Sequence, residues 1–471
     1  MQNGTTENKL NEECGVFGAY GDEESLAELV YYGVFSLQHR GQESAGIAVS
    51  DGKTVASHKG QGLISDVFTE NILSELTREK DYIAVAHTRY STAGTKGVIN
   101  AQPIVAQYLN GGIALAHNGN LVNAKSLRRE LEEEGYLFQT NSDTECILNI
   151  LAKNRNKGHI GALKEVIAKA RGAYSLAMIY DGKLIGLRDP AGIRPLCIGK
   201  KNNTWFISSE SCALTTIGAN LVRDVEPGEL VVIDEDGLKS YQIASKDNKG
   251  GLCIFEYIYF ARPDTTINKK SVYLMRHKMG EKLAEESPVE ADIVTPVPDS
   301  GRSAAVGYSL ASGIPFTEGL IKNRYVARTF IAPTQSERET KVRLKLSPIP
   351  EVFQGKRVVL VDDSIVRGTT IKSLINIIKH AGAKEVHVRI SSPPYISPCY
   401  YGIDTPDPDN LAAAKYSPEE IREIIDADSL HYLSLSGLIE SVGGQMTDYC
   451  SACFTENYFA GRTNDEEKID L

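Results

Sequence analysis

The stretch VVLVDDSIVRGTT, residues 358–370, decides the fold of the second half of this chain. Its first four residues form a continuous apolar run, which is typical of a parallel strand covered on both faces. The next apolar residues have the spacing of one helix face, before Gly382, which is placed to end the helix: Ile371, Leu374, Ile375 and Ile378. A strand pattern follows up to residue 391, and residues 291–313 show the same order of strand, loop and helix. These βαβ units predict a doubly wound parallel sheet with its site at the carboxyl ends of the strands.

The loop after this strand has the residues of a phosphate and cation site. Asp362 and Asp363 come first, then Gly368, and Thr369 and Thr370 stand at the predicted helix start. Backbone N–H groups at a helix start, together with hydroxyl groups, suit a phosphate. The carboxylates suit a ribose or Mg²⁺. The alternative is a strand-end turn whose aspartates only face water. No G-x-x-x-x-G-K-[ST] pattern occurs, so the chain is not a P-loop NTPase.

The first half, residues 14 to about 245, has a different pattern of predicted strands and helices. It contains many short strand patterns broken by glycine, with one charged helix pattern at 123–136, where Leu127 and Leu131 share a face. This mixture predicts sheets packed with helices rather than βαβ winding. Residues 245–252, SKDNKGGL, are polar and rich in glycine, and we expect a linker there.

Composition limits the possible partners. A chain of 471 residues indicates two or three domains. Its formal charge of −10 disfavours a nucleic-acid partner. No apolar stretch approaches the ~20 residues that cross a bilayer, so no membrane partner is expected. Residues 1–13 resemble neither a signal peptide nor a transit peptide. A cytoplasmic location follows, where eight cysteines are thiols or metal ligands rather than disulfides.

The 358–370 stretch resembles the phosphoribosylpyrophosphate signature of the type I phosphoribosyltransferases. In that family the acidic pair holds the ribose hydroxyls and a metal, and the residues after it cradle the 5′-phosphate. The resemblance implies that the phosphate is bound by Ser364, Gly368, Thr369 and Thr370. VPDSG, residues 297–301, resembles the pyrophosphate loop of the family, which implies one Mg²⁺ per subunit at Ser300, Asp362 and Asp363.

Residues 322–330, KNRYVARTF, resemble the mobile lid of the same family. Lys322, Arg328 and Lys345 are then cations that neutralise a pyrophosphate leaving group. The alternative for each is a solvated surface lysine or arginine.

Five motifs of the first half resemble the class II glutamine amidotransferase domain, a four-layer αββα sandwich of the N-terminal-nucleophile type. In order they are CGVFG (14–18), LQHRGQESAGI (37–47), HTRYST (87–92), HNGNLVN (117–123) and SDTE (142–145). Joined to the transferase signature, the chain from 14 to about 460 resembles the glutamine phosphoribosylpyrophosphate amidotransferases.

The position of Cys14 has a chemical reason in this resemblance. If residues 1–13 are a propeptide, Cys14 becomes the N-terminus, and its own α-amino group, with a pKa of about 7.7–8.0, can accept the thiol proton. No partner histidine is needed, and we interpret His87 and His117 as structural. The alternative is a buried strand thiol.

The resemblance also assigns the groups around Cys14. The side-chain amide of Asn118 and the backbone N–H of Gly119 form the oxyanion hole. Arg89 pairs with the α-carboxylate of glutamine, and Asp143 pairs with its α-amino group. The alternative for Arg89 and Asp143 is a structural ion pair.

Four other cysteines match the positions that ligate a [4Fe–4S] cluster in one branch of the family. Cys450 and Cys453 have metal-ligand spacing, and Cys253 and Cys399 supply two further thiolates. By residue type alone four thiolates could equally bind zinc, so the choice of one [4Fe–4S] cluster per subunit depends on the resemblance. The remaining thiols are expected in the core: Cys146, Cys197 and Cys212.

We therefore expect a propeptide (1–13), a glutaminase domain (14–245), a phosphoribosyltransferase domain (253–404) and a helical tail with cluster cysteines (405–471). The implied reaction moves ammonia from glutamine to C1 of phosphoribosylpyrophosphate, giving phosphoribosylamine, glutamate and pyrophosphate. This is the first committed step of purine synthesis. The resemblance also implies purine nucleotides as feedback inhibitors and a homotetramer.

Two rival functions are a non-catalytic nucleotide sensor and a purine-salvage transferase with a decayed amidase. Both are disfavoured because neither has a use for an intact set of amidase residues: Cys14, Arg89, Asn118, Gly119 and Asp143.

Overall fold

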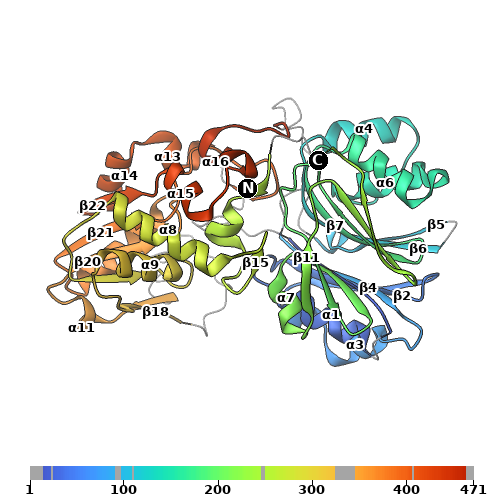
Figure 1. Cartoon of the computed structure of the whole chain (residues 1–471), viewed down its shortest axis with the longest axis horizontal. Helices are drawn as coiled ribbons and strands as arrows, with labels where there is room; N and C mark the ends of the chain where they lie inside the picture. Colours follow the sequence, from blue (N-terminus) through green and yellow to red (C-terminus); the bar gives the residue numbers. More distant parts are fainter. Residues whose placement is uncertain are drawn as a thin grey trace.

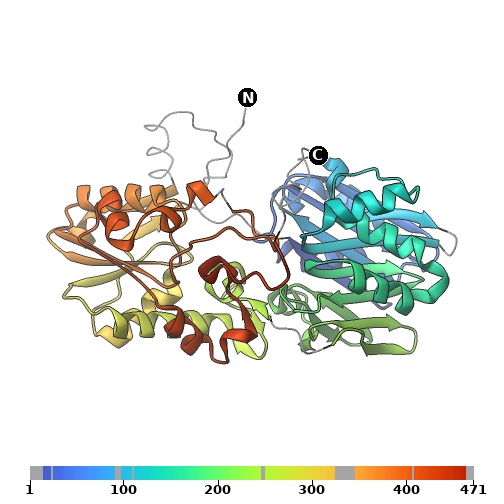
Figure 2. The ribbon, with the colours of Figure 1, turned by 90° about the horizontal axis from the view of Figure 1, so that it is seen from above.

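The computed structural model describes residues 14–22, 25–90, 97–108, 111–245, 250–323, 345–405 and 408–462. Its helices and strands form two halves that lie side by side along the longest axis of the molecule (Figure 1). The view from above shows the same division, with the first half in blue to green and the second in yellow to red (Figure 2). Among the described residues, no helix is long and apolar enough to cross a membrane.

The first half contains two antiparallel sheets. The seven-stranded sheet has the order β11 (Asn220–Asp224), β9 (Cys197–Lys201), β10 (Thr204–Ser208), β1 (Gly15–Tyr20), β4 (Ile83–Arg89), β2 (Ser44–Ser50) and β3 (Val55–Gln61). The six-stranded sheet has the order β13 (Gly237–Gln242), β12 (Glu229–Asp234), β8 (Lys183–Arg188), β7 (Gly172–Tyr180), β6 (Gly111–Leu121) and β5 (Ile104–Tyr108).

Helices cover the outer face of each sheet. The first sheet carries α1 (Leu26–Phe35), α2 (Ile64–Val67), α3 (Glu70–Leu76) and α7 (Ser211–Thr216). The second carries α4 (Ala124–Glu133), α5 (Thr144–Lys153) and α6 (Gly158–Lys169). Along β1, Val16 packs between the two sheets whereas Phe17 packs against the helices, as the twofold side-chain period of a strand requires. The four layers confirm the expected αββα sandwich.

The second half is built on a four-stranded parallel sheet. Its order is β17 (Ile293–Pro296), β20 (Arg357–Asp362), β21 (Glu385–Ile390) and β22 (Ser429–Tyr432). Helices α8 (Val272–Glu286) and α9 (Arg302–Ser312) cover one face, while α12 (Thr369–His380) and α14 (Pro418–Ile425) cover the other. Val359 and Val361 pack on the first of these faces, and Val358 and Leu360 on the second. The 358–370 stretch therefore forms the doubly covered strand, loop and helix that its sequence predicts.

The segment expected as a helical tail, residues 405–471, contains more than helices. Its strand β22 completes the parallel sheet beside β21, and its helix α15 (Leu435–Val442) packs on α8. Near its end, β23 (Tyr449–Cys450) pairs in parallel with β14 (Leu252–Cys253) at the start of the second half. Short strands of two to four residues carry little periodicity, which is why the sequence pattern did not reveal them.

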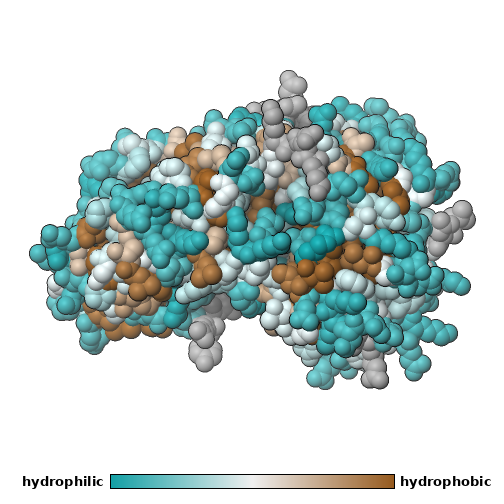
Figure 3. Space-filling view, in the orientation of Figure 1, coloured by the Kyte–Doolittle hydropathy of each residue, from teal (hydrophilic) through white to brown (hydrophobic). Residues whose placement is uncertain are grey.

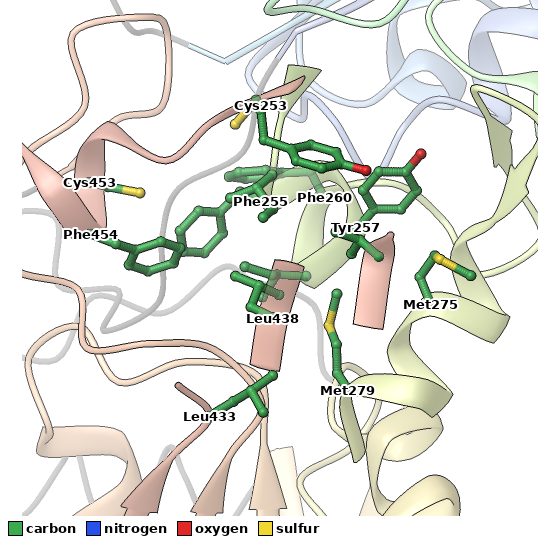
Figure 4. Packing of buried hydrophobic residues seen from close by; sticks show 14 of the residues in the cluster. Cys253, Phe255, Tyr257, Phe260, Met275, Met279, Leu433, Leu438, Cys453 and Phe454 are labelled. Atoms are coloured by element: carbon green, nitrogen blue, oxygen red, sulfur yellow. The ribbon is translucent and has the colours of Figure 1, made fainter. Parts of the chain in front are cut away.

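An aromatic core joins this last segment to the start of the second half. Phe255 stacks on Phe454 with ring centroids 5.3 Å apart, and Tyr395 meets both rings edge-on. Figure 4 shows the two phenylalanine rings side by side, with Cys253 and Cys453 next to them. The cysteines of the tail are thus fixed by hydrophobic packing as well as by the β14–β23 ladder.

Candidate functional site

Cys14 lies at the start of β1, in the middle of the first sheet. The register pairs Gly15 with Thr88, so Cys14 is close to Arg89 at the end of β4. The thiol is buried, and its Sγ donates to the Tyr90 carbonyl at 3.5 Å. The Cys14 carbonyl accepts a hydrogen bond of 3.1 Å from Arg40 Nε.

Burial of the Cys14 thiol favours its protonated form. Burial raises the pKa of Cys14 to about 11, although the positive charges of Arg89 and Arg40 oppose the rise. The negative charge of Asp143 raises this pKa further. With a peptide bond before it, Cys14 has no α-amino group, so at neutral pH the thiol stays protonated.

Asn118 and Gly119 lie next to each other near the end of β6, paired with Ser175 and Tyr174. Asn118 is only 1% exposed, and within the described part of the chain its Nδ2 has no hydrogen-bond partner. A buried donor without a partner is costly, and such groups are found where a ligand supplies the acceptor. Gly119 has φ +143°, and a Cβ there would lie 2.0 Å from the Ala173 carbonyl oxygen, so only glycine fits.

Asp143 stands directly before helix α5 and is tied to the same strand. Its Oδ2 accepts a hydrogen bond of 2.9 Å from the Leu121 backbone. Arg89, on the neighbouring sheet, is also buried. The structure therefore gathers the predicted glutamine-site residues at one end of the two packed sheets.

Both histidines near the site are neutral. His87 Nε2 donates to the His117 carbonyl at 3.0 Å, and burial lowers the pKa of His87 to about 3. Burial also lowers the pKa of His117, whose Nδ1 lies 3.1 Å from Thr144 Oγ1. These contacts support their interpretation as structural residues.

The second group of predicted residues lies at the carboxyl end of β20. Asp362 and Asp363 are 3% and 1% exposed. The Asp363 backbone donates to Asp362 Oδ1 at 2.9 Å, and Ser364 Oγ donates to Asp363 Oδ1 at 2.5 Å. Gly368, with φ +80°, precedes Thr369 and Thr370 at the start of α12.

The 297–301 loop reaches the same edge of the sheet. Val297 donates to the Val361 carbonyl at 2.8 Å, and a Cβ at Gly301 would lie 2.3 Å from that carbonyl oxygen. This close approach brings the Ser300 loop beside the end of β20, where the acidic pair begins.

The three predicted lid cations have different positions. Lys322, at the end of β18 (Leu320–Lys322), binds Asp299 Oδ2 at 2.6 Å and so reaches the 297–301 loop. Lys345 lies beside it, since its carbonyl accepts from the Asn323 backbone at 2.8 Å. Arg328 lies outside the described residues.

The donor set at the end of β20 fits Mg²⁺. Mg²⁺ is usually held by one or two carboxylates together with substrate phosphates and water. The buried pair of aspartates and the nearby serine could provide the protein ligands of such a site.

The four candidate cluster cysteines gather in one region. Cys253 and Cys450 are register partners in the β14–β23 ladder. The sulfurs of Cys253 and Cys453 point toward each other in Figure 4. Burial raises the pKa of both these thiols, and Cys399 and Cys450 contribute to the rise.

The spacing of these thiols bears on the choice of metal. A zinc ion needs four sulfurs around one atom, each at about 2.3 Å, whereas a [4Fe–4S] cluster takes one thiolate at each of four irons and is therefore wider. Among the described residues, no group of three or more His, Cys, Asp or Glu side chains is placed to hold a metal ion, so the choice between the two metals stays a prediction. Free, buried thiols are found elsewhere at Cys146, Cys197 and Cys212, as expected.

Three buried charges that the sequence patterns did not indicate form one group, and one of them, Arg40, contacts Cys14. Arg40 binds Glu210 at 2.5 Å and Glu256 at 2.6 Å, and all three side chains are fully buried. Glu256 comes after the linker and belongs to the second half. Its ion pair with Arg40 therefore connects the second half to the residue that donates to the Cys14 carbonyl. A lone glutamate within the apolar run LCIFEYIYFA, residues 252–261, was the available signal, because a charge there must find a buried partner.

Comparison with known proteins agrees with this arrangement. Residues 87–216 match the glutamine amidotransferase domain and residues 266–391 match the phosphoribosyl transferase domain. The amidophosphoribosyltransferase of Methanocaldococcus jannaschii is 50% identical over 462 residues, covering 94% of this chain and 97% of that protein. That of Bacillus subtilis is 48% identical over 454 residues, covering 95% and 94%.

Solved structures show the same likeness. The B. subtilis glutamine phosphoribosylpyrophosphate amidotransferase complexed with ADP and GMP has a TM-score of 0.88 at 47% identity, covering 94% of this chain and 97% of that chain. A structure described as the allosteric regulatory enzyme of purine biosynthesis has a TM-score of 0.89 at 47% identity, covering 94% and 96%.

Fold and sites together define a glutamine amidotransferase fused to a phosphoribosyltransferase. The two halves carry one reaction, in which ammonia taken from glutamine replaces pyrophosphate on a sugar phosphate. The chain belongs to the amidophosphoribosyltransferase family, whose enzymes catalyse the first step of purine biosynthesis.

Proposed function

We propose that Cys14 is the glutaminase nucleophile and that it works only after residues 1–13, which lie outside the described structure, have been removed. The observation that carries this proposal is the buried Cys14 thiol, which donates to the Tyr90 carbonyl next to Arg89, together with the Asn118 amide, whose Nδ2 has no hydrogen-bond partner in the described structure. A thiol with a pKa of about 11 needs a base, and the new α-amino group provides one at the right place.

The chemistry of the first site follows from these groups. The α-amino group takes the thiol proton, and Sγ attacks the side-chain carbonyl carbon of glutamine. Asn118 Nδ2 and the Gly119 N–H stabilise the oxyanion. The amine returns the proton to the departing ammonia, and water then cleaves the thioester to release glutamate. Arg89 and Asp143 hold the α-carboxylate and α-amino groups of the substrate.

The second site uses ammonia that passes internally from the first. Asp362 and Asp363 hold the ribose hydroxyls and, with Ser300, the cation, while the phosphate lies on Ser364, Gly368, Thr369 and Thr370. Mg²⁺ supplies charge neutralisation to the pyrophosphate leaving group, and Lys322, Arg328 and Lys345 add to it. Positioning and charge account for most of the rate here, since the leaving group is already good.

We propose a [4Fe–4S] cluster on Cys253, Cys399, Cys450 and Cys453, which would join three segments distant in sequence. Anaerobic protein is then brown, holds about four irons per chain, and loses colour and activity together in air. A colourless active protein with about one zinc per chain contradicts the cluster. Full activity of a Cys450→Ser, Cys453→Ser variant contradicts any structural role of the metal.

The remaining proposals concern boundaries, assembly and location. The domains are 14–245 and 253–404, with the tail from 405 contributing a sheet strand to the second.

Apolar side chains form several patches on an otherwise hydrophilic face (Figure 3). Contacts in a homotetramer would cover exposed apolar residues such as Tyr32, Phe35, Tyr273 and Leu274. Purine nucleotides act as feedback inhibitors. None of the eight cysteines forms a disulfide, which fits a reducing, cytoplasmic location.

Substitution of Cys14 tests the first site. Cys14→Ser abolishes glutamine-dependent synthesis and leaves ammonia-dependent synthesis intact, because free ammonia bypasses that site. Intact-mass measurement of the wild-type protein should show a chain that begins at Cys14. An active protein that retains residues 1–13 overturns the nucleophile proposal.

Substitution of the acidic pair tests the second site. Asp362→Asn and Asp363→Asn reduce both the glutamine- and the ammonia-dependent reactions, because both reactions use the phosphoribosyl site. Glutaminase activity measured alone survives. Full ammonia-dependent activity in either variant shows that the carboxylate has no such role. A sensor protein would show none of these activities in the wild type, and a salvage transferase would show no glutaminase.

A further inference from the structure

Three successive residues of the second half contact the first half, and two of them contact β6, the strand that carries the proposed oxyanion hole. The Tyr400 carbonyl accepts a hydrogen bond of 2.9 Å from Asn120 Nδ2. The Tyr401 carbonyl accepts from Arg194, at 3.0 Å from Nε. A Cβ on Gly402 would lie 3.2 Å from Gly119 Cα and 3.1 Å from its carbonyl carbon. We call residues 400–402 the brace.

The brace completes the enclosure of Gly119. On one side, the Gly119 backbone lies so close to β7 that a Cβ would be 2.0 Å from the Ala173 carbonyl oxygen. Gly402 lies on the Gly119 backbone too, and it adopts φ +111°, which a residue with a side chain rarely adopts. Two glycines in contact let the backbones approach closely at the carbonyl side of Gly119, which holds in place the residue whose N–H is a proposed oxyanion donor.

Asn120, the residue after Gly119 on the same strand, is also fixed by a contact with the brace. Its side chain reaches out of the first half to a carbonyl of the second, and its backbone continues the β6–β7 ladder opposite Ala173. A shift of about 1 Å in a reacting group can cost about 10²-fold in rate, so a contact one residue from the donor can affect catalysis without touching the substrate.

We propose that the brace positions the Asn118 and Gly119 donors, which makes Asn120 and Gly402 positioning residues for glutamine hydrolysis. The inference rests on the proposed oxyanion role of Asn118 and Gly119. It makes full glutaminase activity depend on a correctly placed second half, through contacts that involve neither Cys14 nor the glutamine-binding charges.

Asn120→Ala removes the bond to Tyr400, and Asn120→Asp replaces its donor with an acceptor that repels the carbonyl. We expect the glutaminase kcat to fall roughly 10- to 10²-fold, more in the aspartate variant, with the KM for glutamine unchanged. Ammonia-dependent synthesis stays at the wild-type rate. Alkylation of Cys14 by iodoacetamide also keeps its rate, because that displacement forms no oxyanion.

The matched control is Asn123→Ala. Asn123 Nδ2 donates to the Lys169 carbonyl at 2.8 Å, a bond of the same kind three residues away, but Lys169 belongs to the first half. The control should keep the wild-type kcat. An equal fall of kcat in the Asn123 and Asn120 variants, or slowed Cys14 alkylation in the Asn120 variants, shows a general loss of order and overturns the proposal.

Two further variants distinguish the positioning role of the brace from the oxyanion role of Asn118, on which it rests. Gly402→Ala should lower kcat as Asn120→Ala does, with the same unchanged alkylation rate. Asn118→Ala tests the oxyanion hole itself. If Asn118→Ala lowers kcat and the Asn120 and Gly402 variants do not, the brace has no positioning role. If Asn118→Ala has no effect, the oxyanion assignment fails instead.

Discussion

His87 shows how a single buried residue makes this protein sensitive to acid. Its Nε2 donates to the carbonyl of His117, the residue before Asn118. A carbonyl only accepts, so Nε2 carries a proton, and burial keeps the ring neutral at pH 7 by lowering its pKa. The folded state keeps the ring neutral down to a pKa of about 3, whereas in the unfolded chain the pKa is about 6.5.

Between these two values the unfolded state binds a proton that the folded state does not. The contribution of His87 to stability is therefore complete above pH ~6.5 and is lost as the pH falls toward ~3, by up to about 1.4 kcal/mol per pH unit. We expect the unfolding midpoint of the wild type to fall more steeply from pH 7 to pH 5 than that of His87→Gln. Equal slopes in thermal scans of the two proteins would contradict this.

The start of helix α12 ends the loop that we propose binds the phosphate, and it exposes backbone N–H groups to that loop. Gly368 makes the transition with φ +80°, and among the described residues a Cβ there would meet only Ile425 Cγ2, at 3.6 Å. Space therefore permits alanine, and only the left-handed backbone opposes it, at a cost of about 1–2 kcal/mol.

Gly313 at the end of α9 provides the control for this element. It has φ +73°, and a Cβ added to it would point into open space beside the described part of the chain. Gly368→Ala and Gly313→Ala should reduce stability by similar amounts in denaturant unfolding. Only Gly368→Ala should raise the KM for phosphoribosylpyrophosphate. A raised KM in both variants would mean that strain alone, rather than the phosphate loop, is responsible.

Elements with a strong period were predictable, and short ones were not. The apolar run Val358–Val361 and the spaced isoleucines of α12 specify a buried strand and a helix without any other information. The two-residue ladder of β14 and β23 has no period to detect, and it depends on residues about two hundred positions apart. The same limit applies to the site. Motifs point to Cys14, Asn118 and Asp362 as candidates, whereas Glu256 and Asn120 stand out only through their contacts with the other half.

The two halves of the molecule are joined by charge as well as by packing. Arg40 lies between Glu210 of the first half and Glu256 of the second, and none of the three side chains reaches solvent. Removing one member of a buried ion pair typically costs about 3–5 kcal/mol, because the remaining charge loses its partner. Since Arg40 keeps Glu210, we expect Glu256→Gln to lie at the lower end of that range.

Glu256→Gln should also reduce glutamine-dependent activity more than ammonia-dependent activity, since Arg40 holds the Cys14 carbonyl. Glu440→Gln is the control: it removes an exposed partner of Lys282 at 2.9 Å and should change stability by no more than about 1 kcal/mol. The measurements are denaturant unfolding and the glutamine- and ammonia-dependent activities of both variants. Equal effects of the two substitutions would show that the buried charges do not couple the halves.

The pairing of Cys253 with Cys450 also determines which part of the molecule can be completed first during synthesis. A ribosome delivers the chain from its first residue, so residues 14–245 are complete well before Tyr449 and Cys450 emerge to close the ladder with β14. Residues 400–402 are likewise made after the whole glutaminase sheet pair. With the brace as we propose it, the half that releases ammonia reaches its full rate only when the half that consumes ammonia has been synthesised.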